Sequence, residues 1–145
     1  MTKLTIAIGN DHAGTELKNC LINHFREVCS FTNFGTNSAD SVDYPDFAHQ
    51  VAQSIEKKES ELGILICGSG NGVNMTANKY KNVRSGLAWN KEVSILIKAH
   101  NNANVLCIPA RFVSKEDAIE IVEHFLQTNF EGGRHEKRVN KIPNN

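Results

Sequence analysis

Short apolar runs alternate along this chain with longer segments whose apolar residues recur every three or four positions. The runs are rich in Ile, Leu and Val, as buried strands are, and the longer segments have the period of amphipathic helices. Alternating strands and helices form βαβ units, whose strands are parallel and whose helices cover both faces of the sheet. We therefore predict an α/β fold, a three-layer α/β/α sandwich around a five-stranded parallel sheet, with strands at residues 4–9, 31–34, 62–67, 84–88 and 104–108.

The helical segments complete this outline. Ser114 with Asp117 three residues later resembles a capping box, which opens a helix. At 145 residues the chain suits one domain with its own core, residues 1–145. A polar tail, 131–145, follows the last helix and contains Gly132-Gly133 as a hinge. We expect helices around residues 17–28, 47–55, 73–78, 93–97 and 118–126.

Charge and cysteine usage narrow the class of protein. Sixteen Lys and Arg balance sixteen Asp and Glu, which argues against a general electrostatic binder of nucleic acid or membrane. No segment has membrane-spanning length, and the first residues do not resemble a signal peptide. The four cysteines show no CxxC spacing, so we expect reduced thiols in a cytoplasmic protein with neither nucleic acid nor membrane as partner.

Cys67 ends the apolar run at 62–67 and opens directly into Gly68-Ser69-Gly70-Asn71-Gly72. The glycines predict a tight turn whose backbone N–H groups can close around an anion, ahead of a helix N-terminus. A thiol in that position favours the thiolate, the form that acts as base or nucleophile. A small buried cysteine beside a structural turn is the alternative. Three glycines in the five positions after it favour function.

Other polar groups stand at the junctions between strands and helices. Ligands of parallel sheets bind at the carboxyl ends of the strands, and we expect four places there: Asp11-His12, the Cys67 loop, His100 to Asn102, and Arg111. Each has a structural alternative. Asp11 can cap a helix, His12 can be a surface residue, His100 can belong to a polar turn, and Arg111 can simply cover the sheet edge.

The tail adds Arg134 and Arg138, which share one face if the segment is helical. Two arginines on one face suit a phosphate group, although a solvated basic tail is the simpler reading.

Several chemistries are excluded by missing residues. A cysteine phosphatase loop requires arginine where this chain has Val73, and no GK[ST] ends the loop as a Walker motif requires. The glycines follow the third strand as GxGxG, unlike the dinucleotide fingerprint. The histidines lack metal-ligand spacing, so we expect no catalytic metal and no cofactor. The remaining groups suit proton abstraction next to a carbonyl, with an enediolate held by backbone amides.

The motifs, taken in order, resemble ribose-5-phosphate isomerase type B, a family grouped with the galactose-6-phosphate and allose-6-phosphate isomerases. The resemblance implies a Rossmann-like fold, a metal-independent aldose–ketose isomerase, and homodimers or dimer-based tetramers whose sites are shared between subunits. It covers nearly the whole chain. The segments that carry it are Gly9-Asn10-Asp11-His12-Ala13-Gly14, Asp43-Tyr44-Pro45, Ile66 to Gly72, Ala77-Asn78-Lys79, His100-Asn101, and Glu131-Gly132-Gly133-Arg134-His135 with Arg138.

The resemblance also implies roles for individual residues. Cys67 would be the base that moves the proton between C2 and C1, and His100 would open the sugar ring with help from Asp11. The amides of the loop, at Gly68, Gly70, Asn71 and Gly72, would stabilise the enediolate together with the Ser69 hydroxyl. Asn101 and Tyr44 would line the sugar. The phosphate would be held by His12, Arg111, Arg134 and Arg138, so the tail would contribute to the phosphate site.

Two comparisons within the family refine this expectation. Many relatives carry threonine where this chain has Ser69, which preserves the hydroxyl. A second branch replaces the cysteine by serine and uses a glutamate shortly after the glycine loop, whereas Val73, Asn74 and Met75 supply no acid here. The sequence therefore indicates the cysteine mechanism.

Three alternatives stay open. One is an isomerase of a hexose 6-phosphate, allose or galactose 6-phosphate. The second is a non-catalytic sugar-phosphate binding module, against which Cys67, Ser69 and His100 argue because binding alone needs none of them. The third is a cysteine-dependent hydrolase.

Overall fold

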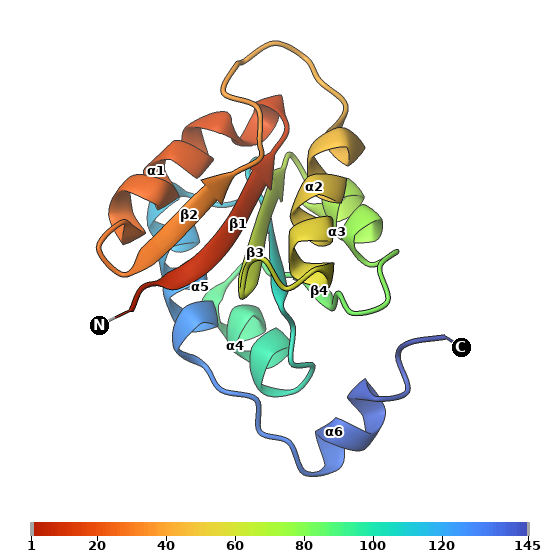
Figure 1. Ribbon diagram of the computed structural model, residues 1–145. Coiled ribbons are helices and arrows are strands. Elements are labelled where there is room, and N and C mark those ends of the chain that lie inside the picture. Colours follow the sequence, from red (N-terminus) through yellow and green to blue (C-terminus); the bar gives the residue numbers. More distant parts are fainter. Residues whose placement is uncertain (1, 145) are drawn as a thin grey trace.

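The computed structural model describes residues 2–144 and contains a sheet of five parallel strands. The strands lie in the order β2-β1-β3-β5-β4, so β3 is central and β2 and β4 form the edges (Figure 1). The predicted α/β class and five-stranded parallel sheet are confirmed. The strands are β1 (Leu4–Asn10), β2 (Cys29–Asn33), β3 (Leu62–Cys67), β4 (Ser85–Leu87) and β5 (Val105–Pro109).

Helices cover both faces of the sheet, and each face has its own apolar core. On one face α1 (Thr15–Phe25), α4 (Lys91–Ala99) and α5 (Lys115–Gln127) pack against alternate residues of the strands. On the other, α2 (Tyr44–Glu56) and α3 (Asn71–Ala77) do the same. Ile64 and Leu65, neighbours in β3, lie in different cores because successive side chains of a strand point to opposite faces.

The ends of the helices follow local chemistry. Ser114 Oγ accepts a hydrogen bond from the amide of Asp117 at 3.0 Å, as the capping pattern predicts. Asn90 caps α4 in the same way through the amide of Val93. The first helix is shorter than expected, because it ends at Phe25 and leaves Val28 exposed in the turn before β2.

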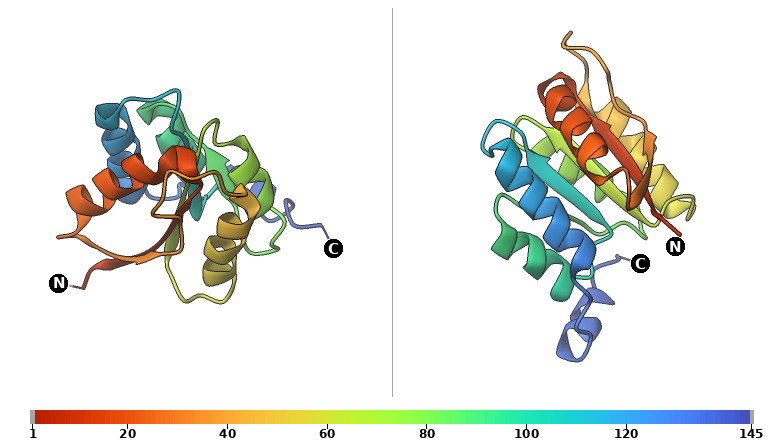
Figure 2. Two further views of the ribbon diagram at one scale, coloured as in Figure 1. Left: turned by 90° about the horizontal axis from the view of Figure 1, so that it is seen from above. Right: turned by 90° about the vertical axis from the view of Figure 1, so that its left-hand side faces the viewer.

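A sixth helix, α6 (Arg134–Val139), lies beyond the amino ends of the strands, at the far end of the molecule from the turn after β1 (Figures 1 and 2). It is preceded by Gly132 and Gly133, both with positive φ, which allow the sharp turn into the helix. The amide of Glu131 bonds to the carbonyl of Ala99 at 2.9 Å and ties this segment to the end of α4. Within residues 2–144, no helix is both long enough and apolar enough to span a membrane.

Candidate active site

A cavity of about 440 Å³ opens at the carboxyl edge of the sheet, around the end of β3. Residues from four strand-to-helix junctions line it, although those residues are far apart in the sequence. Parallel strands bring these junctions together at one edge. The lining residues are Asp11, Tyr44, Cys67, Gly68, Ser69, Gly72, Arg111 and Phe112.

Cys67 is the last residue of β3 and is 5% exposed. The amide of Gly70 donates a hydrogen bond to its Sγ at 3.2 Å, so the loop folds back over the sulfur. Gly70 has φ +76, and a Cβ there would overlap the Leu87 side chain. The turn therefore requires glycine at this position. Ser69 is exposed, and its hydroxyl accepts a hydrogen bond from the amide of Asn71 at 3.3 Å.

Arg111 lies against the same loop. Its amide donates to the carbonyl of Gly68 at 3.0 Å, and a Cβ on Gly68 would be 2.9 Å from the guanidinium Nη1. Gly72 plays the corresponding role for Tyr44, because a Cβ there would overlap the phenol ring. Glycine at these two positions lets a guanidinium and a phenol pack closely against the loop that follows Cys67.

Asp11 performs its structural role and also faces the cavity. Its Oδ1 accepts a hydrogen bond from the amide of Ala13 at 3.0 Å and so caps the short 3-10 helix η1 (His12–Gly14). The Asp11 amide bonds to the carbonyl of Ile66 at 3.2 Å, which fixes it beside the end of β3. The carboxylate is thus both a cap and a member of the site.

His12 lies at the same edge but outside the lining of this cavity. Its Nδ1 accepts a hydrogen bond from the amide of Val42 at 3.2 Å, which ties the turn after β1 to the loop before α2. The other ring nitrogen, Nε2, is the atom with which His12 can bind a substrate group.

Lys18 shapes this edge of the sheet and was not identified from the sequence. Its side chain is fully buried, and Nζ donates to the carbonyl of Thr36 and to Asn37 Oδ1, both at 2.6 Å. Burial lowers the pKa of this amine. These bonds hold the loop that leads to Tyr44. The spacing of Lys18 three residues before Leu21 was the available signal, because it puts the lysine on the buried side of α1.

His100 and Asn101 lie at the opposite edge, and the expectation of a single edge was wrong. They follow the end of α4 and precede β5, where the amide of Gly63 bonds to the carbonyl of Asn104 at the amino end of β3. Cys67 is at the other end of that strand. A strand of six residues is roughly 20 Å long, so one chain does not bring His100 to Cys67.

At this amino edge His100 meets Glu131 and His135. The two imidazole rings stack with centroids 4.1 Å apart and planes inclined by 11°. Each Nε2 lies 3.6 Å from an oxygen of the Glu131 carboxylate. The pKa of His135 is lowered by partial burial first, and then by the nearby His100 and Arg134 charges. Histidine spacing missed this cluster because residues 100 and 135 are far apart in the chain.

Arg134 and Arg138 both lie on α6 and are exposed. The helix gives them the shared face that the i, i+4 spacing implied. They belong to the amino edge together with His100. The expected site residues therefore form two groups at opposite ends of the sheet.

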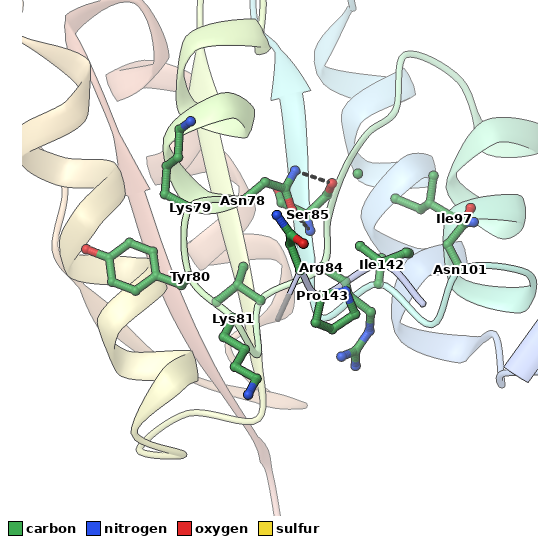
Figure 3. A pocket seen from close by; sticks show the side chains of 14 residues that line it. Asn78, Lys79, Tyr80, Lys81, Arg84, Ser85, Ile97, Asn101, Ile142 and Pro143 are labelled. Carbon is green, nitrogen blue, oxygen red and sulfur yellow. Dashed lines mark hydrogen bonds between the residues drawn. The ribbon is translucent and has the colours of Figure 1, made fainter. Parts of the chain in front are cut away.

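A larger cavity, about 750 Å³, lies between the turn before β4, the end of α4 and the C-terminal segment (Figure 3). Asn101 and Ile142 contribute to its wall, and the Asn78 side-chain amide donates to the carbonyl of Ser85 at 2.9 Å. Among the described residues that line it, none supplies a thiol, carboxylate or imidazole. Although this cavity is the larger of the two, we assign the reacting groups to the smaller cavity at Cys67.

Parallel α/β sheets bind their ligands at the edge where Cys67 lies, so the fold and this cavity together define a Rossmann-like protein with a ligand-binding site at that edge. The chain belongs to the ribose/galactose isomerase family, whose model matches residues 6–142. The resemblance seen in the motifs is confirmed, and the protein is an isomerase.

Individual relatives are similar to this chain over nearly its full length. A probable ribose-5-phosphate isomerase B from Mycoplasma pneumoniae is 45% identical over 94% of this chain and 91% of its own. Ribose-5-phosphate isomerase B of Escherichia coli is 39% identical over 94% and 93%. The solved structure of ribose-5-phosphate isomerase B from Mycoplasma genitalium with bound ribulose-5-phosphate has a TM-score of 0.93, at 43% identity, and covers 98% of this chain and 95% of its own.

Proposed function

We propose that this protein interconverts ribose 5-phosphate and ribulose 5-phosphate by proton transfer through an enediolate, without a catalytic metal, in the cytoplasm. The observation that carries the proposal is the thiol of Cys67 at the strand end, held under a glycine loop and flanked by Asp11 and Arg111. Relatives named as ribose-5-phosphate isomerases at up to 45% identity support the choice of substrate.

Cys67 is the base in this proposal. Its thiolate takes the proton from C2 of the open-chain aldose, and the carbonyl oxygen at C1 becomes the oxyanion of the enediolate. The thiol then returns the proton to C1, while the hydroxyl proton passes from O2 to the oxyanion O1, so that C2 becomes the ketone and no atom is gained or lost. The amides from Gly68 to Gly72 and the Ser69 hydroxyl meet the developing charge. One such donor typically contributes about 2.7–4 kcal/mol to the barrier.

Ring opening needs an acid, because ribose 5-phosphate is mostly cyclic. His100 protonates the ring oxygen, and Asp11 removes the proton from the anomeric hydroxyl to release the aldehyde. Since His100 and Cys67 of one chain are at opposite edges of the sheet, the histidine must come from another copy. The proposed enzyme is therefore a homodimer, or a tetramer of such dimers, in which each site combines the carboxyl edge of one chain with the amino edge of its partner.

A dimer with two-fold symmetry forms two such sites, because each chain places its amino edge against the carboxyl edge of the other. Large apolar side chains are exposed on α3, after β4, on α4 and in the C-terminal segment, at Met75, Trp89, Leu96 and Ile142. A dimer interface that covers some of them would remove apolar surface from water.

The phosphate and the sugar need separate groups. Arg134 and Arg138 of the partner subunit hold the phosphate, with His12 and Arg111 of the chain that supplies Cys67. Tyr44 and Asn101 line the sugar from the two sides. Guanidinium groups suit this role because they bind phosphate oxygens in pairs.

The first test is ketose formation from ribose 5-phosphate by the purified protein in excess chelator, with allose 6-phosphate and galactose 6-phosphate measured alongside. Turnover of the pentose phosphate supports the proposal. Turnover of a hexose phosphate alone would keep the chemistry and overturn the substrate. No turnover of any of the three would favour a binding module.

The second test addresses the shared site. Cys67→Ala and His100→Asn are each expected to be inactive. When the two are unfolded together, mixed and refolded, half of the random dimers contain one intact site, so about a quarter of wild-type activity should return. No recovery despite proven mixed dimers would contradict a site shared between subunits.

A further inference from the structure

We propose that Lys18 is a positioning residue for substrate binding. Its buried ammonium group holds the loop from Thr36 to Val42, and that loop fixes the orientation and the tautomer of the His12 ring. This inference rests on the proposed function, in which His12 binds the phosphate group of the substrate.

Lys18 is an unusual residue for the core of this protein. Its side chain is fully buried, and among the described residues no carboxylate forms an ion pair with it. An ammonium group without a counter-ion is costly to bury unless its protons are donated to hydrogen-bond acceptors. A methionine has nearly the same length and would fill the same space without that cost. The burial of this charge therefore points to the groups that the ammonium binds.

Both hydrogen bonds of the ammonium go to the start of one loop. Nζ of Lys18 donates to the carbonyl of Thr36 and to Asn37 Oδ1, both at 2.6 Å. The side-chain amide of Asn10 donates to the same Thr36 carbonyl at 3.1 Å. Hydrogen bonds from a charged donor are short and strong, so the ammonium is the main anchor of this part of the loop.

The loop is held again before it reaches His12. Thr15 lies three residues before Lys18, and its hydroxyl donates to the carbonyl of Ser38 at 2.8 Å. Further along, the amide of Val42 donates to Nδ1 of His12 at 3.2 Å. The loop therefore runs from two anchors on α1 to the histidine ring.

The bond from Val42 determines where His12 carries its proton. A ring nitrogen that accepts a hydrogen bond from an amide has no proton, so the neutral ring keeps its proton on Nε2. That N–H is the group that can donate to a phosphate oxygen. If the loop is released, the ring can rotate and adopt either tautomer, so the phosphate loses a fixed donor.

The other groups of the site are held without Lys18. The Asp11 amide bonds to the carbonyl of Ile66, and its carboxylate accepts from the amide of Ala13. Cys67 is held by the amide of Gly70. Loss of the Lys18 ammonium should therefore weaken substrate binding more than the chemical step.

Steady-state kinetics separate these two effects. Lys18→Met should raise KM for ribose 5-phosphate about tenfold, while kcat changes little. Leu21→Ala is the matched control, because it removes another fully buried side chain from α1 but breaks no bond to the loop. It should lower stability and keep the wild-type KM. Asn37→Ala removes one acceptor of the ammonium from an exposed position, so it tests the same anchor with a smaller rise in KM if Lys18→Met does not fold.

The tautomer of His12 is measured without substrate, from the nitrogen NMR shifts of its ring at about pH 8, where the ring is neutral. The wild type and Leu21→Ala should carry the proton on Nε2, and Lys18→Met and Asn37→Ala should give a mixture of tautomers. If the protein does not turn over ribose 5-phosphate, the proposed function fails, but this measurement still decides the role of Lys18.

A double variant tests whether Lys18 acts through His12. In the His12→Gln background, adding Lys18→Met should leave KM unchanged, because the group that it positions is already absent. A further rise in KM by the same factor as in the wild-type background would overturn the proposal. A wild-type tautomer in both Lys18→Met and Asn37→Ala would also overturn it, as would an equal change of tautomer in Leu21→Ala.

Discussion

The amide of Gly70 donates a hydrogen bond to the sulfur of Cys67 at 3.2 Å, across a turn that only glycine can make. The last residue of β3 and the loop that follows it are thus one rigid unit. Because of this hydrogen bond, the position of the sulfur and the conformation of the loop cannot change separately. The first two predictions follow from this coupling.

Cys67→Ala should nearly abolish turnover and leave the fold intact. Loss of a general base typically lowers kcat by about 10²-fold or more, and the alanine occupies less space than the thiol. Steady-state kinetics and a thermal melt measure the two effects. Cys20→Ser, a change in a partly exposed cysteine of α1, is the control and should keep wild-type kcat. If purified Cys67→Ala retains more than a tenth of wild-type kcat, Cys67 is not the base.

Gly70→Ala should destabilise the protein and also disable the site. The left-handed backbone costs an alanine about 1 kcal/mol, and its Cβ would overlap Leu87 and lie 3.2 Å from the Pro109 nitrogen. Urea unfolding measures the loss. Gly132→Ala is the matched control, since Gly132 also has positive φ, but apart from its two chain neighbours no described residue has an atom within 4 Å of its Cβ position. Equal losses in the two variants would show that the overlap with Leu87 has no cost.

Arg134→Ala should mainly raise KM for the sugar phosphate. The phosphate group does not react, so it is bound about equally in the ground state and the transition state. Initial rates over a range of substrate concentrations separate KM from kcat. Lys137→Ala removes an equal charge from the same exposed helix and should change KM little. An unchanged KM with a collapsed kcat is the result that the anchoring role does not allow.

Alkaline pH should destabilise the protein through Cys107. Burial raises the pKa of this thiol to about 12, although a hydrogen bond with Ser85 at 3.0 Å opposes the rise. Because the folded pKa lies above the unfolded one, near 9, the folded state is favoured fully below about pH 9. This stabilisation is lost as the pH rises toward 12.

Urea midpoints at about pH 8 and about pH 10.5 measure this dependence. Cys107→Ala should be less stable at both values because it leaves a small cavity, but its midpoint should fall less between them. Burial also raises the pKa of Cys29, so part of the decline should remain in the variant. If the urea midpoints of the variant and the wild type fall equally between these pH values, Cys107 is not a source of the alkaline loss of stability.

Local patterns were enough to predict most of the fold. β1, β3 and β5 were identified because an apolar run of that length has to be buried, whereas β2 and β4 are less apolar and gave weaker signals. The observed bounds differ from the expected ones by a residue or two. The turn after Cys67 was predicted for a similar reason, since closely spaced glycines allow few conformations other than a tight loop. Asp11 and Arg111 were placed correctly at the carboxyl edge because each follows a strand there, whereas Tyr44 was suggested only by the family resemblance.

The expectation that His100 lies at the same edge of the sheet as Cys67 was wrong for a different reason. A segment that precedes a parallel strand lies at its amino end, so His100 could not share an edge with Cys67 of the same chain. The family resemblance implied a shared site, but the residues alone did not show which groups were separated. That separation depends on the direction of every strand, which is a property of the whole sheet.

The sequence by itself determined the parallel α/β sheet, the thiol at the end of β3 and the glycine loop around it, because hydrophobic period and backbone freedom act over a few neighbouring residues. The tertiary structure decided which polar groups meet. It buried Lys18 against the loop at Thr36 and Asn37, and it stacked His100 on His135 beside Glu131. Such contacts join residues far apart in the chain, and they depend on how whole elements pack.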